Sequence, residues 1–140
     1  MPILLDTAAV SELRRSENRM HPGVRTWQRG VGDLFISVIT LHELRFGIRK
    51  VEARDPVFAA QLTAWYAVIL AQPDRFRILP VDRAIAELAA DFRAAHNTPF
   101  EDSLIAATAK VHNLTVITRN ADDFTPTGVP VLNPWEKAGK

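Results

Sequence analysis

Short apolar runs alternate along the chain with longer segments in which apolar residues recur at helical spacing. Predicted strands cover residues 3–5, 34–37, 76–79, 114–118 and 128–132. A predicted helix follows the first strand, and further helices cover residues 24–28, 40–50, 56–71, 82–95 and 101–112. The helices at 40–50 and 56–71 are expected to pack as a hairpin. This alternation predicts a three-layer α/β/α fold with a mostly parallel central sheet.

Length and composition favour a single domain that spans residues 1–140. A chain of 140 residues with 47% hydrophobic content can bury one core and is too short for two independent ones. The longest apolar stretch, around residues 65–71, is too short to cross a bilayer, and no secretion signal is visible before Asp6. We therefore expect a cytoplasmic protein without a membrane span.

Charge, cysteine content and missing motifs exclude several classes of protein. The chain has no cysteine, which excludes disulfides, zinc-thiolate sites, iron–sulfur clusters and cysteine nucleophiles. It also lacks the motifs of zinc peptidases, P-loop enzymes and serine hydrolases. Its 17 basic and 16 acidic residues argue against a strongly basic nucleic-acid coat. RNA stays a candidate substrate, because an enzyme that cuts a polyanion needs positive charge only locally.

Four carboxylates stand where predicted strands end or predicted helices begin. In an open parallel sheet, ligands bind beyond the carboxyl ends of the strands. Asp6 directly follows the first predicted strand, and the run at residues 118–123 after a later strand carries Asp123. Glu43 and Asp102 lie near the starts of helices that would face the same edge. We therefore expect three or four carboxylates to share one pocket.

Such a pocket requires a cation. Neighbouring carboxylates repel one another, and some take up protons unless a cation neutralises them. Hard oxygen ligands favour Mg²⁺ or Mn²⁺, which bind through a few carboxylates and keep several waters. Paired ions stabilise the attacking and leaving oxygens when a phosphodiester is cut. The pattern therefore indicates metal-assisted hydrolysis of a phosphodiester.

Each acid also has an ordinary structural explanation. Asp6 is a typical N-cap of the helix that follows it. The segments 40–43 and 98–101 both fit the capping-box pattern S/T-x-x-E. In the second segment, Asp102 would then be only a favourable charge in the first helical turn. Asp123 would be an Asx-turn residue in a loop. Only the joint placement of the four acids favours a functional site.

Several blocks in a fixed order carry a resemblance to a known family. They are Leu5-Asp6-Thr7 with residues 11–13, residues 36–48, residues 101–109, residues 118–124 and Asn133-Pro134-Trp135. In these blocks the sequence strongly resembles PIN-domain proteins, specifically bacterial toxins of the VapC and FitB type. The match runs nearly end to end, and the order of the blocks makes it specific.

The resemblance implies a metal-dependent endoribonuclease that acts as the toxin of a toxin–antitoxin pair. The family's acidic residues map onto Asp6, Glu43, Asp102 and Asp123. These four would be both the catalytic groups and the ligands of Mg²⁺, or of Mn²⁺ in its place. Asp123 is chosen over its neighbour Asp122 because it directly precedes Phe124, as in the family's pattern. The implied partners are an RNA substrate, a protein antitoxin and a second copy of the chain in a homodimer.

Two other functions stay open at the level of sequence. The domain could be an antitoxin-bound co-repressor with little catalysis of its own; since it lacks a recognisable DNA-binding motif, it would reach operator DNA only through the antitoxin. A metal-dependent phosphatase for small substrates would use the same ions. Arg45 and Arg49, one helical turn apart, would contact RNA phosphates or an antitoxin, although such a pair is more often a solvated helix face.

Overall fold

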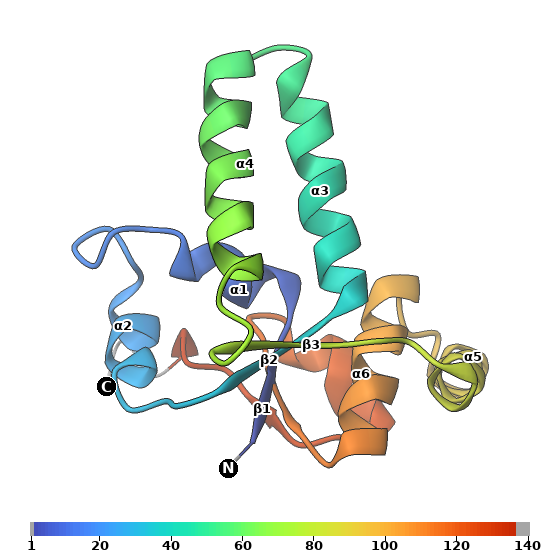
Figure 1. Cartoon of the computed structure of the whole chain (residues 1–140). Helices are drawn as coiled ribbons and strands as arrows, with labels where there is room; N and C mark the ends of the chain where they lie inside the picture. The colour runs from blue at the N-terminus through green and yellow to red at the C-terminus, as the bar shows by residue number, and fades with distance from the viewer. Residues whose placement is uncertain (1, 137–140) are drawn as a thin grey trace.

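Parallel strands form the centre of the molecule (Figure 1). The computed structural model describes residues 2–136, and within this range the strands are β1 (Ile3–Leu5), β2 (Leu34–Ser37), β3 (Phe76–Leu79), β4 (Thr115–Ile117) and β5 (Val131–Leu132). Their order across the sheet is β3-β2-β1-β4-β5, and each neighbouring pair is parallel. The predicted strands are confirmed, and the sheet is parallel throughout.

Helices connect the strands. They are α1 (Thr7–Leu13), α2 (Pro22–Gln28), α3 (Val38–Glu52), α4 (Pro56–Leu70), α5 (Arg83–His96), α6 (Phe100–His112), α7 (Ala121–Phe124) and the 3-10 turn η1 (Thr125–Thr127). Every helix predicted from apolar spacing is present. The structure also contains one short helix, α7, where the sequence predicts a loop.

Both faces of the sheet are covered, which confirms the three predicted layers. Successive residues of a strand point to opposite faces. Ile3 and Leu5 pack in a core with residues of α1, α2, α3 and α4, whereas Leu4 packs on the other face with residues of α5, α6 and α7. All three are at most 2% exposed. A strand buried on both faces has a continuous apolar sequence, which explains why β1 is recognisable from only three residues.

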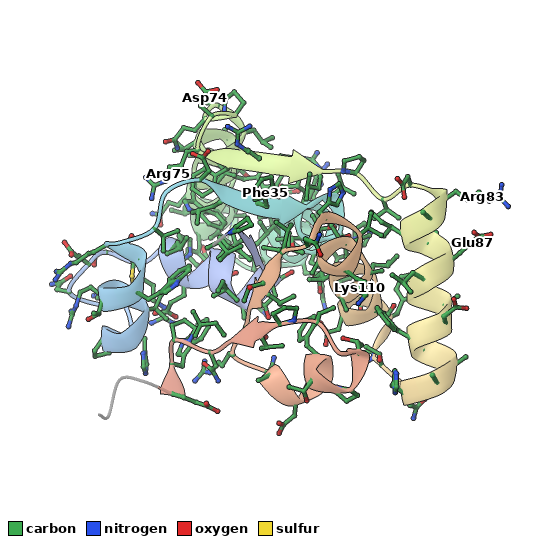
Figure 2. All side chains as sticks on the ribbon, turned by 90° about the horizontal axis from the view of Figure 1, so that it is seen from below. Phe35, Asp74, Arg75, Arg83, Glu87 and Lys110 are labelled. Atoms are coloured by element: carbon green, nitrogen blue, oxygen red, sulfur yellow. The ribbon has the colours of Figure 1, made fainter. Side chains whose placement is uncertain are left out.

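Helix α5 illustrates how helical spacing separates buried from exposed side chains. Ile85, Ala89 and Phe92 are buried in the core that includes Leu4. Arg83 and Glu87 point away from the body of the molecule (Figure 2) and form an exposed ion pair at 3.4 Å. An exposed pair of this kind contributes about 0.5 kcal/mol or less, so burial of the apolar face holds α5 in place.

Helices α3 and α4 form the predicted hairpin, which projects from the sheet (Figure 1). Some of its large apolar side chains stay exposed: Phe46 is 58% exposed, Val57 70% and Val68 55%. Trp65 of α4 is partly buried and packs against the core. Even with this apolar surface, no helix among the described residues is long and apolar enough to cross a membrane.

Two helices do not begin with the capping boxes that the sequence suggests. Helix α3 begins after Ser37, whose hydroxyl accepts a hydrogen bond from the N–H two residues later (3.0 Å), so Thr40 lies inside the helix. Helix α6 begins after Pro99, and Thr98 instead donates its hydroxyl to a backbone carbonyl of α5 (3.4 Å). The capping-box explanation is therefore wrong for both segments, and Glu43 needs another role.

Candidate metal centre

The carboxyl ends of β1 and β4 lie side by side at the point where the strand order reverses. From β1 the chain moves to β2 and β3 on one side, and it later returns to β4 and β5 on the other. Leu5 pairs with Ile117, and the N–H of Asp6 donates to the Ile117 carbonyl at 3.1 Å. Parallel sheets bind ligands in the crevice in front of such a switch point. Asp6 and Thr118 each directly follow one of the two strands.

Asp6 combines a helix cap with a buried charge. Its Oδ1 accepts a hydrogen bond from the N–H of Ala9 at 2.9 Å, and the side chain is only 5% exposed. Burial raises the pKa of Asp6, and the charge of Glu43 adds to the rise. Hydrogen bonds from the Thr118 hydroxyl and from backbone N–H groups of α1 act in the opposite direction. Because a carboxylate has two oxygens, the cap is compatible with a ligand role.

Glu43 is held by the hydroxyl group of one threonine, which in turn contacts a second threonine. Thr7, the first residue of α1, donates its hydroxyl to Oε1 of Glu43. The Thr7 hydroxyl also contacts Oγ1 of Thr40 at 3.2 Å, and Thr40 is completely buried. These contacts place Glu43 near enough to Asp6 for its charge to raise the pKa of Asp6. The sequence does not reveal the contact between the two threonines, because 33 positions separate them and the capping-box pattern gives Thr40 a different role.

Asp102, in the first turn of α6, has the most perturbed carboxyl group of the four. Its pKa is raised to about 7, first by burial, then by a hydrogen bond with Asp123 and by the negative charges of Asp123, Asp6 and Glu43. A hydrogen bond between two carboxyl groups requires a proton on one of them. The other three acids named by the sequence therefore lie close enough to Asp102 to raise its pKa.

Helix α7 distinguishes Asp123 from its neighbour. Both Asp122 and Asp123 are exposed residues of this one-turn helix, which buried Phe124 fixes to the core. Only Asp123 of the two is among the groups that raise the pKa of Asp102. Within α7, the side that approaches Asp102 is therefore the side that carries Asp123.

The donor set suits a hard divalent cation. All four side chains are carboxylates, and within residues 2–136 none of them forms an ion pair with lysine or arginine. The same part of the chain contains no preformed group of three or more acidic, histidine or cysteine side chains set to hold an ion. Without a paired lysine or arginine, the acids repel one another, which helps to raise the pKa of Asp102 to about 7, so that its carboxyl group can hold a proton near neutral pH. The residues present fit a cation that takes the place of that proton.

The two arginines that the sequence singles out on α3 lie outside this centre. Arg49 forms an exposed ion pair with Glu52 at 3.0 Å, as in an ordinary solvated helix face. Arg45 lines an open groove of about 420 Å³ together with His42, Phe46 and other residues of α3 and α4. Neither arginine is among the groups that shift the pKa of Asp6 or Asp102.

Known proteins resemble this chain over nearly its whole length. Residues 3–128 match the family model described as the PIN domain. The VapC ribonuclease Y4jK of Sinorhizobium fredii is 34% identical over 145 residues, covering 97% of this chain and 99% of the relative. The crystal structure of FitAcB from Neisseria gonorrhoeae has a TM-score of 0.71 at 32% identity, covering 95% of this chain and 98% of that one. The structure of FitAB bound to an IR36 DNA fragment has a TM-score of 0.67 at 31% identity and covers 95% of both chains.

Proposed function

This chain belongs to the PIN domain family, and from that premise we propose that it is a metal-dependent endoribonuclease that acts as the toxin of a toxin–antitoxin pair. The observation that carries the proposal is the meeting of four carboxylates at the switch point of the sheet, where Asp6, Glu43 and Asp123 help to raise the pKa of Asp102 to about 7. A relative named as a VapC ribonuclease, similar over nearly the whole length, supports RNA as the substrate.

The proposed catalytic groups are also the proposed metal ligands: Asp6, Glu43, Asp102 and Asp123. When bound, Mg²⁺ or Mn²⁺ would lower the pKa of a water molecule and neutralise charge on the scissile phosphate. Without that neutralisation the four carboxylates would repel an RNA phosphate. The protein's own contribution is to hold Asp6 and Glu43 by hydrogen bonds and to release the proton that the raised pKa of Asp102 keeps on its carboxyl group.

Replacing Asp6 by asparagine tests the proposal without removing the helix cap. Asparagine caps a helix about as well as aspartate does, and its amide oxygen can still accept the N–H of Ala9. We expect Asp6→Asn to keep its fold by circular dichroism and to lose metal-dependent RNA cleavage. Asp82→Asn is a matched control, because Asp82 caps α5 with the same 2.9 Å bond to a backbone N–H. Undiminished cleavage by folded Asp6→Asn would refute the assignment.

The proposal includes the setting of the enzyme. We propose that residues 1–140 form one PIN domain, that the protein works in the cytoplasm as a homodimer, and that a protein antitoxin inhibits it. The support for an antitoxin is that a structural relative over 95% of this chain is a FitAB complex. Co-expression with the product of an adjacent short reading frame, followed by size-exclusion chromatography with light scattering, measures both the dimer and the antitoxin complex.

A co-repressor role is the second candidate, because that FitAB complex is bound to a DNA fragment. In this role the chain would stabilise an antitoxin on operator DNA and contribute little catalysis. Binding of the purified chain, of its antitoxin and of both together to the operator separates the two functions. If the complex binds DNA and the chain never cuts RNA, the co-repressor role is favoured over the nuclease.

A further inference from the structure

Two threonines that lie behind Glu43 form a chain of hydroxyl groups. Thr7 begins α1 at the end of β1, and Thr40 lies in the first turn of α3 at the end of β2. Since β1 and β2 are neighbours in the sheet, the two helix starts lie next to each other. The hydroxyl of Thr7 contacts both Oγ1 of Thr40, at 3.2 Å, and Oε1 of Glu43.

The number of protons on each hydroxyl group determines which group donates each hydrogen bond. A threonine hydroxyl carries one proton, so Thr7 can donate to only one of its two partners. Glu43 is the closer partner and a carboxylate only accepts, so the proton of Thr7 belongs to Glu43. The contact between the threonines must then be donated by Thr40, which is fully buried and whose hydroxyl needs a partner. The order is Thr40 to Thr7 to Glu43.

We propose that Thr7 and Thr40 form a hydroxyl relay that positions the Glu43 carboxylate for its metal ion. The assignment rests on the proposed function and deepens it. Hydrogen bonds in series polarise one another, so donation by Thr40 strengthens the bond from Thr7 to Glu43. The relay fixes one oxygen of Glu43 and selects one orientation of a flexible side chain, which lowers the entropy lost when a cation binds. Thr7 and Thr40 are positioning residues and touch neither metal nor RNA.

Isosteric variants test the relay through metal affinity. Mn²⁺ binding to the purified full-length chain is measured by isothermal titration calorimetry for the wild type, Thr7→Val, Thr7→Ser and Thr40→Val. We expect Thr7→Val to weaken Mn²⁺ binding about tenfold, Thr40→Val roughly threefold, and Thr7→Ser less than about twofold. Cleavage by Thr7→Val should lose kcat while KM for RNA is unchanged, because the relay does not contact the substrate.

A buried threonine elsewhere supplies the control. Thr108 is as buried as Thr40, and its hydroxyl donates to a carbonyl of its own helix α6 at 2.7 Å. Thr108→Val therefore removes an equivalent hydroxyl outside the relay and should leave Mn²⁺ affinity unchanged. If Thr7→Val does not fold, Thr40→Val carries the test, since it leaves the bond from Thr7 to Glu43 in place.

The outcomes separate the relay from the function it rests on. If the wild type binds Mn²⁺ and Thr7→Val binds it equally well, the relay is refuted and the metal site stands. If Thr7→Ser, which keeps the hydroxyl, binds as weakly as Thr7→Val, the hydroxyl does not determine the affinity, and the relay is again refuted. A wild type that binds no Mn²⁺ overturns the proposed metal site and the relay with it. Restoration of affinity by Thr7→Ser alone supports the relay.

Discussion

The two halves of the carboxylate cluster differ in what holds them. On the side of β1 and α3, Asp6 and Glu43 accept hydrogen bonds from hydroxyl and backbone N–H groups. On the side of α6 and α7, the hydrogen bond that shifts the pKa of Asp102 comes from a second carboxyl group, that of Asp123. In the first half, hydrogen bonds to Asp6 partly offset the effect of burial on its pKa, whereas in the second half the hydrogen bond and the charge of Asp123 add to the effect of burial on the pKa of Asp102.

This difference explains how a cluster of like charges can fold before a cation binds. Hydrogen bonds to the carboxylate of Asp6 favour its ionised form and partly offset the rise in its pKa that burial causes. Asp102 is half protonated near neutral pH, because its pKa is about 7. The folded protein thus carries less repulsion than four full charges would produce. Metal binding is expected to release a proton from the half that contains Asp102.

The largest effect is expected from replacing Asp102, whose pKa the other three acids raise. Asp102→Asn should lower RNA cleavage by at least about 100-fold, since it removes a metal ligand and the proton that is exchanged for the metal. The variant should unfold at a temperature no lower than the metal-free wild type, because the substitution relieves repulsion by the other three acids. Cleavage rates and thermal melts on the same sample measure both. If Asp102→Asn loses its fold together with its activity, the prediction is contradicted, because the variant is expected to stay at least as stable as the metal-free wild type.

The neighbouring aspartates of α7 give the next largest contrast. Asp123→Asn should reduce cleavage by about 10- to 100-fold, because Asp123 interacts with Asp102. Asp122→Asn is the matched control in the next position of the same helix, and it should stay within about twofold of the wild type. Initial rates under identical Mg²⁺ measure the pair. A larger loss for Asp122→Asn would mean that the ligand of this half is misassigned.

A pH-dependent stability is expected from the half that contains Asp102. The folded pKa of Asp102, about 7, lies above its ordinary value of 3.8, so the folded state binds more protons than the unfolded state between these values. Metal-free protein should therefore lose stability as pH rises from 5 to 8, by about 1–2 kcal/mol after allowance for the partial exposure of Asp102. Urea unfolding with EDTA at both pH values measures the difference. In Asp102→Asn the loss of stability between pH 5 and pH 8 should be smaller. If the loss is as large as in the wild type, groups other than Asp102 cause it.

A smaller effect is expected from weakening the hydrogen bond from Thr118 in the half that contains Asp6. Thr118 donates to Asp6 and favours its ionised form. Thr118→Val should weaken Mn²⁺ binding roughly fivefold, and Thr118→Ser should restore it, since serine keeps the hydroxyl. Calorimetric titration of the two variants tests this. Equal affinities for both would show that the hydroxyl has no part in holding Asp6.

The sequence predicts the fold well because its apolar signals are local. Strand β1 is buried on both faces and α5 on one, so their patterns of apolar residues are unambiguous. Contacts across the sheet are not encoded in any local pattern. The contact of Thr7 with Thr40 depends on the pairing of β1 with β2. Local signals also misassign the start of α3, where Ser37 caps the helix in place of the Thr40 capping box.

The sequence predicts the residues of the candidate site, but it does not predict how they pair. Position at strand ends and helix starts singles out the four acids, whereas their pairing as Asp102 with Asp123 and Asp6 with Glu43 requires the folded chain. The one-turn helix α7 is too short to carry a helical period, so the sequence predicts a loop around Asp123. That helix is what brings Asp123, in place of Asp122, toward α6.

Cleavage of a mixed pool of structured RNAs by the purified protein tests the metal-dependent nuclease most directly. Four reactions run in parallel: wild type with Mg²⁺, wild type with EDTA, wild type with EDTA followed by excess Mg²⁺, and Asp102→Asn with Mg²⁺. The proposed mechanism predicts cutting in the first and third reactions and none in the other two. Cutting that persists in EDTA, or that Asp102→Asn performs as fast as the wild type, would contradict it.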